Sequence, residues 1–569
     1  MPTPRSVPLS LIPRPRTVAV NGGVCSLDPA TPVLCEPGPH DLAGWAEPVL
    51  DLLRRGTGLA LPMSPARSSP APTSITFGHL AGEPAEAYTL EITEAGVLLR
   101  AGDREGLIWG LQTLRQLLPA EVERPLPRVA ADPGRPDGEL RPRPADWLPP
   151  PGKPLPWPTV TVGKDIGGQR RGQRNAGDAA AAAAQPAPHP VWSLPCLQIA
   201  DQPRYEWRGL LLDSCRHFQQ VAAIERLIDL MSLHKLNRLH WHLTEDQGWR
   251  LEIKARPLLT EIGAWRVDSD GVRYGGFYTR EEARHVVAYA AARGITVVPE
   301  IELPGHCRAA LAAYPELSCR GIALPVETAW GVFPDIYCAG NDAVFSFLEE
   351  VLTEVLDIFP SPFIHLGGDE CPPDRWSECP RCRERMAREG LGDADGLHGW
   401  FVQRMARWLA DRGRRLIGWD EILAGGLAPG SVVQSWRGFE GALEALRRGH
   451  DAIVSPISHV YLDQDLARVG LETVLGFEPE GPRGEPATLA GSAGRTLGGE
   501  MCVWTEWIPQ AVLDERVFPR ACGGSEALWS PRPSGGARRR DVAEFRARLV
   551  NHSQRLRALG VAGLQASRL

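Results

Sequence analysis

The sequence predicts an α/β protein whose larger, C-terminal part is a (β/α)₈ TIM barrel and whose N-terminal part is a small α+β accessory domain. The chain has 569 residues, more than one compact core of ordinary size uses, so two or three domains are expected. From about residue 203 onward, short apolar segments recur, each ending in polar or aromatic residues. Most are followed by an amphipathic helical segment, and a series of eight such β/α units is typical of a closed barrel.

The first domain is predicted over residues 1–128. Residues 87–93 and 96–100 alternate apolar and polar side chains, which is the period of a half-buried strand. Residues 106–118 follow with apolar side chains at helical spacing. Strands followed by a helix indicate a small α+β unit.

Residues 129–195 differ sharply in composition. Proline, glycine and arginine dominate, and an alanine tract occupies residues 179–184. Such a segment buries too little apolar surface to offset the entropy lost on ordering it. We predict a flexible linker or insertion here, with the barrel domain following over residues 196–569.

The predicted barrel strands are eight apolar segments in one order along the chain. They are residues 210–213, 236–243, 295–301, 363–366, 416–419, 431–436, 451–455 and 501–504. Between the second and the third, Thr279 and Glu282 form a capping signal for a helix. A doubly wound sheet is the alternative fold. It would need a glycine-rich phosphate loop after its first strand, and the sequence has none there.

Composition and charge argue against several classes of partner. A net charge of -7, spread along the chain, gives no support for nucleic-acid binding. No stretch approaches the ~20 apolar residues of a membrane-spanning helix, so no membrane partner is expected. The N-terminus lacks the apolar core of a secretory signal, which predicts a cytoplasmic protein, with secretion left open if the true start differs.

Cysteines are too sparse for a disulfide framework in a chain of this length. Cys379 and Cys382, with Cys371 nearby, form the one cluster with the spacing of metal ligands. A structural zinc site needs four ligands, usually two such pairs, and the sequence has no second CxxC. We therefore predict no metal site, and we expect no cofactor. Cys319 and Cys338 are close enough in sequence to pair in an oxidising compartment, which stays open.

The most informative segment is residues 363–370, an apolar strand that continues into two glycines and then into Asp369 and Glu370. Charged groups at the end of a buried strand must be solvated, paired or catalytic. Two carboxyl groups can also be pushed apart in pKa, so that one donates a proton while its neighbour stays ionised. This pattern predicts a glycosidase, although by itself it would also fit a solvated pair of acids.

The ends of the other predicted strands carry acids, an arginine and aromatic rings, and the barrel architecture places all of them at one mouth. Acids and arginine hold sugar hydroxyls by charge-assisted hydrogen bonds, and aromatic rings pack on the apolar faces of a sugar. The residues concerned are Asp213, Arg216, His217, Glu245, Asp246, Trp249, Glu300, Glu302, His306, Trp419, Asp420, Glu421, Trp436, Tyr461, Asp463, Trp504 and Glu506.

Three histidines lie within predicted strands. The period of two residues places His240 and His242 on one face of their strand. We predict packing roles for both, and a satisfied core position for His365, in preference to catalysis. A metal site built from these histidines and the acids is an alternative, but no His-x-x-x-His helix pair is present.

These motifs resemble those of glycoside hydrolase family 20, the β-N-acetylhexosaminidases. The resemblance rests on His-x-Gly-Gly-Asp-Glu at 365–370, Asp-x-x-Arg-His-Phe at 213–218, Pro-Gly-His at 304–306, Gly-Trp-Asp-Glu at 418–421 and Trp-Thr-Glu at 504–506. It covers the barrel nearly end to end, and the N-terminal unit resembles the family's accessory domain. It implies an exo-acting hydrolase that removes terminal β-linked GlcNAc or GalNAc, with a glycan or glycoconjugate as partner.

By this resemblance Glu370 is the general acid and base, and the enzyme supplies no nucleophile. The substrate's own 2-acetamido oxygen attacks C1 and gives an oxazolinium intermediate with net retention. Asp369 is implied to orient the acetamido group and, as the ionised member of the pair, to stabilise the charge on its nitrogen. Tyr461 is implied to donate a hydrogen bond to the acetamido oxygen.

The resemblance also implies which residues bind the sugar. Trp419, Trp436 and Trp504 would form the walls of the site and press on the N-acetyl methyl group. Arg216 would hold O3 and O4, and Glu506 would hold O4 and O6.

Further residues take supporting roles in the resemblance. Asp463 would contact the O6 side, and His306 and Glu245 would support the catalytic pair. Glu245 and Asp246 stand where many members carry two aspartates, so the role of the longer side chain is the least defined. Arg208, in Trp-Arg-Gly, is expected to be structural.

Three alternatives remain at this level. A lacto-N-biosidase-like or poly-GlcNAc-cleaving enzyme would differ in its loops, and the sequence does not predict the conformation of those loops. A sugar-binding protein without activity would be expected to lack the acid Glu370. A metal-dependent hydrolase would lose activity with a chelator, whereas the family mechanism predicts no change.

Overall fold

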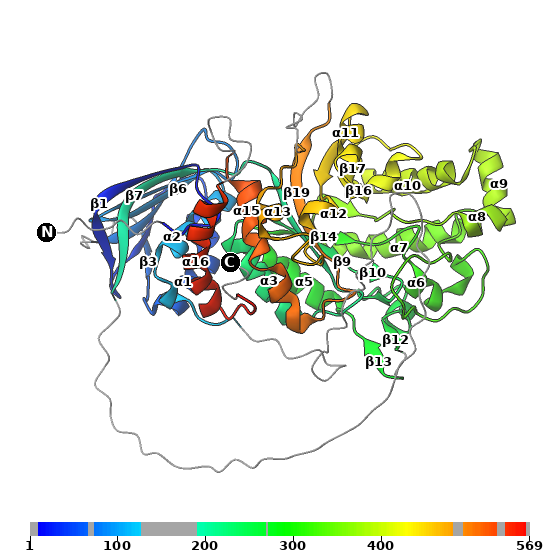
Figure 1. The fold of residues 1–569 in the computed structure, drawn as a ribbon, viewed down its shortest axis with the longest axis horizontal. Helices are drawn as coiled ribbons and strands as arrows, with labels where there is room; N and C mark the ends of the chain where they lie inside the picture. The colour runs from blue at the N-terminus through cyan, green and yellow to red at the C-terminus, as the bar shows by residue number, and fades with distance from the viewer. Residues whose placement is uncertain are drawn as a thin grey trace, which may run out of the picture.

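The computed structural model describes residues 9–65, 73–126, 191–268, 271–481, 493–531 and 541–564. Figure 1 shows an N-terminal sheet at one end of the molecule and a larger barrel domain at the other. The predicted linker, residues 129–195, lies outside the described residues except for its last few positions.

The N-terminal domain is a seven-stranded sheet with two helices on one side. Its strand order is β1-β7-β5-β6-β4-β2-β3. Burial alternates along β5 (Tyr88–Thr93) and β6 (Gly96–Ala101), which confirms both predicted strands, and the predicted helix is α2 (Arg104–Leu117). The other elements are β1 (Thr17–Leu27), β2 (Val33–Cys35), α1 (Leu42–Thr57), β3 (Met63–Pro65), β4 (Ser74–His79), η1 (Ala120–Val122) and β7 (Trp192–Asp201).

The boundary predicted at residue 196 is wrong by about ten residues. Strand β7 pairs antiparallel with β1 and with β5, so it completes the N-terminal sheet although it follows the long segment 127–190. The barrel begins at β8 (Trp207–Asp213). Strand pairing between segments a hundred or more residues apart leaves no local signal in the sequence, which explains the error.

The barrel prediction is confirmed at every strand. Eight parallel strands close in the order β14-β15-β16-β17-β18-β19-β8-β9. The last strand starts earlier than predicted, at Thr496. The strands after β8 are β9 (Arg238–His242), β14 (Thr296–Glu300), β15 (Phe363–His365), β16 (Arg415–Trp419), β17 (Val432–Ser435), β18 (Asp451–Val454) and β19 (Thr496–Val503).

Helices surround the barrel and shorter elements fill the loops at its carboxyl end. The main helices are α3 (Val221–Leu233), α5 (Arg280–Ala291), α7 (Asp342–Ile358), α10 (Ala394–Ala410), α11 (Glu440–Arg447), α15 (Arg520–Trp529) and α16 (Val542–Ala558). The loop elements are β10 (Thr244–Glu245), β11 (Gly248–Trp249), α4 (Leu258–Glu261), β12 (Trp265–Val267), β13 (Arg273–Gly275), α6 (Arg308–Ala313), η2 (Pro315–Leu317), α8 (Asp374–Glu378), α9 (Pro380–Glu389), η3 (Asp420–Leu423), α12 (Ile457–Val460), α13 (Leu471–Leu475), η4 (Gln510–Val512) and α14 (Leu513–Val517).

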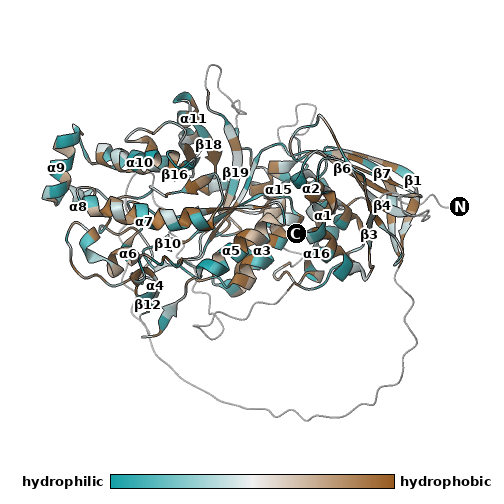
Figure 2. Cartoon of the chain, turned by 180° about the vertical axis from the view of Figure 1, so that it is seen from behind, coloured by the Kyte–Doolittle hydropathy of each residue, from teal (hydrophilic) through white to brown (hydrophobic). Residues whose placement is uncertain are grey.

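Helix α5 starts at the predicted capping box, in which the Thr279 side chain accepts a hydrogen bond from Glu282 N. Figure 2 shows brown and teal residues mixed along α7 and mainly teal residues along α9. This fits α7 packing on the barrel with one face and α9 lying at the edge of the molecule. Among the residues that the structure describes, no helix is both long and apolar enough to span a bilayer.

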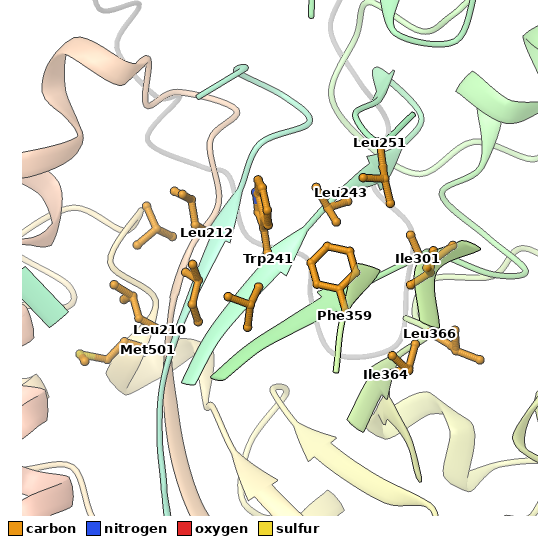
Figure 3. Packing of buried hydrophobic residues seen from close by; sticks show 14 of the residues in the cluster. Leu210, Leu212, Trp241, Leu243, Leu251, Ile301, Phe359, Ile364, Leu366 and Met501 are labelled. Carbon is orange, nitrogen blue, oxygen red and sulfur yellow. The ribbon is translucent and has the colours of Figure 1, made fainter. Parts of the chain in front are cut away.

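Successive side chains along β9 point alternately into an apolar layer and into a polar layer. Leu239 and Trp241 belong to the large core between barrel and helices, where Trp241 lies among leucines from neighbouring segments (Figure 3). His240 and His242, the intervening residues, contact carboxylates instead of this core. The prediction that these two histidines share a face is confirmed.

The two domains are held together by buried polar contacts. Arg208 is fully buried in β8 and forms an ion pair with Glu86 of the N-terminal domain, which confirms its structural role. Gln112 of α2 donates to Ser232 of α3 at 2.9 Å. Arg208 stands near the start of β8 and Ser232 near the end of α3, so these contacts lie at the amino-terminal end of the first barrel strand, away from α8 and α9 (Figure 1).

Candidate active site

The turn after β15 delivers the acidic pair to the mouth of the barrel. Gly367 has φ 64°, and a Cβ there would lie 1.6 Å from Oε2 of Glu302, so only glycine fits. Glu370 itself has φ 45°, in the left-handed region that residues with a side chain rarely adopt. Backbone strain of this kind persists where the surrounding structure enforces it, and it is frequent at active sites.

His306 lies against both acids. Its Nε2 is 3.5 Å from Glu370 Oε2 and 3.7 Å from Asp369 Oδ2. Its Nδ1 is 2.8 Å from Glu245 Oε1 and 3.2 Å from Asp246 Oδ2. One imidazole therefore joins the end of β15 to the acids that follow β9.

The charge state of His306 follows from this setting. Burial lowers its pKa, but the Glu245 carboxylate and the hydrogen bond to Asp246 outweigh burial and hold that pKa well above its usual range. The ring is therefore an imidazolium at neutral pH. It supplies a fixed positive charge beside Asp369 and Glu370.

The two acids differ in exposure and in electrostatics. The side chain of Asp369 is 15% exposed and that of Glu370 is 33% exposed. Burial raises the pKa of Asp369 to about 7; His306 opposes this rise and the neighbouring Glu370 adds to it. The expectation that Asp369 is the firmly ionised member of the pair therefore does not hold for the substrate-free structure. Burial is the reason, because it favours the neutral acid.

Arg216 is clamped by two buried carboxylates. Its Nη2 lies 2.9 Å from Glu245 Oε2 and its Nη1 lies 3.3 Å from Asp213 Oδ2. Its guanidinium carbon stands 5.1 Å from the centre of the Trp504 ring. Glu245, whose longer side chain left its role undefined, thus connects Arg216 to His306.

Glu506 and Asp463 lie on the Arg216 side of the site. Burial raises the pKa of Glu506 to about 7, Arg216 lowers it, and Asp213 and Asp463 raise it further. These interactions place Glu506 within electrostatic range of both Arg216 and Asp463. Neither belongs to the fully buried residues.

The predicted aromatic residues form one continuous set. The Trp419 and Trp504 ring centres are 5.9 Å apart, Trp504 and Tyr461 are 6.4 Å apart, and Tyr461 and Trp436 are 6.3 Å apart. Trp419 is buried, with Nε1 donating to Glu300 at 2.9 Å, whereas Trp436 and Trp504 are half-buried. All four come from the carboxyl ends of different strands.

Beneath this mouth lies a buried polar layer made by histidines and glutamates of the barrel interior. His242 Nδ1 is 2.6 Å from Glu300 Oε2, His240 Nδ1 is 2.7 Å from Glu500 Oε1, and His365 Nδ1 is 2.8 Å from Glu300 Oε1. Burial lowers the pKa of His240, but Glu500 and Glu300 raise it to about 10. The predicted packing roles are therefore refined to a charged, hydrogen-bonded layer that fixes the Trp419 ring from below.

Some residues at the site have a larger part than the sequence suggested. Glu302 lies against Gly367, and burial together with Asp369 raises its pKa well above the usual range. Asp246 accepts a hydrogen bond from Arg308 N at 2.9 Å, and Glu421 accepts one from Trp436 Nε1 at 3.1 Å. All three are among the strand-end residues that the sequence analysis placed at the mouth of the barrel, but it assigned no partner to any of them. The directions of these three side chains, and with them their partners, depend on how the loops pack in space.

The arrangement gives this mouth a defined chemical capacity. A partly exposed carboxyl group can transfer protons to a ligand, and the buried acid beside it can meet a polar N–H group of that ligand. The arginine and the outer acids can hold hydroxyls, and the rings offer apolar walls. Every residue predicted for the site lies at this carboxyl end of the barrel.

Comparison with known proteins agrees with this geometry. Residues 205–532 match the family profile "Glycosyl hydrolase family 20, catalytic domain", and residues 9–132 match "Glycosyl hydrolase family 20, domain 2". The first match covers more than half of the chain and contains all the site residues.

Two curated relatives and a solved structure show the extent of the likeness. The chain is 36% identical to a β-hexosaminidase of Porphyromonas gingivalis, over 97% of this chain and 64% of the relative. It is 33% identical to a β-hexosaminidase of Akkermansia muciniphila, over 82% of this chain and 83% of the relative. The chain thus spans just under two thirds of the first relative's length.

The solved structure is the GH20 exo β-N-acetylglucosaminidase of Vibrio harveyi in complex with N-acetylglucosamine. It superimposes with a TM-score of 0.77 at 29% identity, covering 99% of this chain and 79% of that one. Fold, motifs and relatives agree, and the chain belongs to glycosyl hydrolase family 20, the family of these β-hexosaminidases.

Proposed function

We propose that this protein is an exo-acting β-N-acetylhexosaminidase that hydrolyses terminal, non-reducing β-linked GlcNAc or GalNAc. The observation that carries the proposal is the pair Asp369 and Glu370 held against the His306 imidazolium within a ring of aromatic side chains. The names of the relatives and the GlcNAc bound to the Vibrio harveyi enzyme support the same substrate class.

Glu370 is assigned as the general acid and base. It donates its proton to the glycosidic oxygen while the bond from that oxygen to C1 breaks and the 2-acetamido oxygen bonds to C1. A water molecule then gives its proton to Glu370 and attacks C1 of the oxazolinium, which opens to restore the acetamido group. Two displacements at C1 yield the retained β-anomer.

Asp369 is assigned to the acetamido nitrogen. The nitrogen becomes positively charged as the ring closes, and a carboxylate at this largely buried place stabilises that charge. Burial raises the pKa of Asp369 in the free protein, and the positive charge that develops on the nitrogen lowers that pKa and so favours the ionised acid. Tyr461 lies within electrostatic range of Asp369 and is assigned as donor to the acetamido oxygen.

The outer residues are assigned to the remaining hydroxyls. Arg216, fixed by Asp213 and Glu245, binds O3 and O4, while Glu506 and Asp463 bind on the O4 and O6 side. These contacts bind the hydroxyls at the non-reducing end of the sugar. A sugar with a further residue attached at O3, O4 or O6 would not fit them, and this is the physical basis for exo action. Trp419, Trp436 and Trp504 restrict the N-acetyl group to the reactive orientation.

The proposal is tested by comparing p-nitrophenyl β-GlcNAc and β-GalNAc with p-nitrophenyl β-glucoside. Since the glucoside lacks the attacking acetamido group, its kcat/KM is expected to be at least ~10³-fold lower. A thiazoline mimic of the oxazolinium should inhibit competitively, and NMR should show the β-anomer of the product first. Equal rates on both sugar types, or an α-anomer released first, would contradict substrate assistance.

Tyr461→Phe is expected to lower kcat by about 10–100-fold with little change in fold, because one hydrogen bond to the reacting oxygen is lost. Tyr289→Phe is a matched control, since its hydroxyl bonds Asp229 at 3.0 Å on the helical layer of the barrel. Steady-state kinetics on the GlcNAc substrate measure both variants. If Tyr461→Phe raised KM alone, Tyr461 would be a binding residue and its assigned role would be wrong.

A further inference from the structure

Four cysteines from three separate segments converge beside the active-site loops. Cys319 follows η2, Cys338 precedes α7, and Cys379 and Cys382 stand at the start of α9. The Sγ–Sγ distances are 3.7 Å for Cys319 and Cys382, 3.8 Å for Cys338 and Cys379, and 3.6 Å for Cys338 and Cys382. All four sulfurs lie within 4.8 Å of one another.

We propose that Cys319, Cys338, Cys379 and Cys382 bind one structural Zn²⁺ ion. Tetrahedral zinc has Zn–S bonds of ~2.3 Å, which gives a distance of ~3.8 Å between neighbouring sulfurs. The three distances above match that edge length. Four thiolates in a closed tetrahedral set are the ligands of structural zinc sites, and no position is left for a substrate or water.

Disulfide bonds explain the same sulfurs less well. A disulfide needs a sulfur–sulfur distance of about 2.05 Å between two chosen partners. Cys338 instead lies almost equally far from Cys379 and from Cys382, so its position selects neither partner. Equal spacing around a common centre is what a metal ion requires.

The backbone around the sulfurs is built for close approach. The Ser318–Tyr337 bridge and the hydrogen bond from Cys338 N to Leu317 O, at 2.9 Å, place Cys319 and Cys338 side by side. Gly340 lies so near α9 that a Cβ there would stand 2.5 Å from Cys382 N. Its N–H hydrogen-bonds to the sulfurs of Cys338 and Cys382.

Charge also favours four thiolates at this place. Cys379 and Cys382 lie at the N-terminal end of the ten-residue helix α9, whose dipole favours negative charge. The Arg381 side chain hydrogen-bonds to the Cys379 sulfur and donates to Ser318 O at 3.2 Å. One cation and a helix N-terminus thus offset the two negative charges that remain when Zn²⁺ binds four thiolates.

The site fastens the loop after β14 to the loop after β15. The first loop carries His306 and continues to Cys338, and the second carries Glu370 and continues to Cys379. Trp376 Nε1 donates to Tyr337 O at 2.8 Å, which is a second tie between the same loops. The zinc ion would therefore stabilise the framework that holds Glu370 against His306, without contacting the substrate.

The sequence prediction of no metal site is revised by this proposal. That prediction relied on the absence of a second CxxC. Cys319 and Cys338 do not have CxxC spacing, and the antiparallel bridge next to them brings them together as a pair. Only one of the two pairs has a local signature.

The test is the metal content of the full chain, produced with zinc in the medium and purified under reducing conditions without a histidine tag. Inductively coupled plasma mass spectrometry is expected to find about one zinc per chain, since the four ligands make one closed site. Mercurial modification of the thiols should release that zinc, measured with a colorimetric chelator. Brief EDTA treatment should leave both zinc and activity in place, which separates this ion from a catalytic metal.

Variants assign the zinc to the cluster. Cys319→Ser, at the half-buried ligand, and Cys382→Ser should each retain less than about a fifth of the zinc and melt at lower temperature. Cys371→Ser is the matched control, because Cys371 is the cysteine nearest in sequence to the cluster but is not one of its four members, and this variant should retain the zinc. If the ligand variants fail to fold, the wild-type chain still tests the proposal. Its intact mass after denaturation and alkylation should show twelve free thiols, which excludes disulfides, and its zinc content should be about one per chain.

Three results would overturn the proposal. They are a zinc content near zero in protein whose thiols are reduced, a mass that shows disulfides among these cysteines, and unchanged zinc in both ligand variants. Iron in place of zinc would overturn the identity of the metal, since tetrahedral thiolate sites also accept iron.

Discussion

Glu370→Gln is expected to lower kcat on a GlcNAc-terminated oligosaccharide by about 10³-fold, within the 10²–10⁴-fold range of general acid–base catalysis. Glutamine keeps the shape of the side chain and its position near His306 but has no proton to donate. The loss should be smaller on p-nitrophenyl β-GlcNAc, because its leaving group needs little protonation. Steady-state kinetics on both substrates measure this difference.

Glu225→Gln provides the control for that experiment. Glu225 lies on α3, is half-buried like Glu370, and pairs with His285 at 2.6 Å away from the site. Its replacement should leave kcat and KM unchanged. Full activity of Glu370→Gln on the oligosaccharide would show that another group is the acid, and the assigned mechanism would be wrong.

Asp369→Asn is expected to lower kcat by about 10²–10³-fold, because the amide does not carry the negative charge that stabilises the oxazolinium. Inhibition by the thiazoline should weaken in parallel, since that inhibitor resembles the intermediate. KM should change less than kcat. Loss of substrate binding with an unchanged kcat would contradict the role of Asp369 in the reaction.

The same variant should change stability with a defined pH dependence. Asp369 keeps its proton up to pH of about 7 in the folded protein, whereas an unfolded Asp loses it near pH of about 4. Between these values the folded state binds more protons at Asp369, so the contribution of Asp369 to the free energy of unfolding falls as pH rises and then stays level above pH of about 7. The amide that replaces the carboxyl group does not titrate, so Asp369→Asn should be more stable than wild type at pH 8, by on the order of 4 kcal/mol at most.

Thermal melts at pH 5 and pH 8 measure this effect. The gain in Tm of Asp369→Asn over wild type should be larger at pH 8 than at pH 5. Asp411→Asn, at an exposed position after α10, should show no such difference. An equal shift at both pH values would mean that Asp369 carries no buried charge penalty.

Much of the fold followed from local patterns. The barrel strands were predictable because each is a short apolar segment whose following residues change to polar or aromatic types, and the helix cap at Thr279 is a local hydrogen-bond pattern. Strand β7 was not predictable in the same way, because its partners β1 and β5 are far away in the chain. Pairing between distant segments is decided by the geometry of the whole sheet.

The site divides along the same line. Glu370 and Asp369 were predictable because paired acids at the end of a buried strand are costly without a purpose. The role of Glu245 as the link between Arg216 and His306 was not, since it depends on how three strand ends meet in space. The raised pKa of Asp369 was also hidden, because burial is a tertiary property.

By itself, the sequence determined the barrel, its order of strands and the set of residues at its mouth. These features depend on the periodicity of apolar residues and on the residue types at strand ends, and both can be recognised within short segments. The tertiary structure alone decided the contacts among them: the imidazolium of His306 beside both acids, the polar layer under Trp419 and the meeting of four cysteines. The physical reason is that distances and burial, and with them charge states and metal geometry, exist only once segments far apart in the chain are packed together.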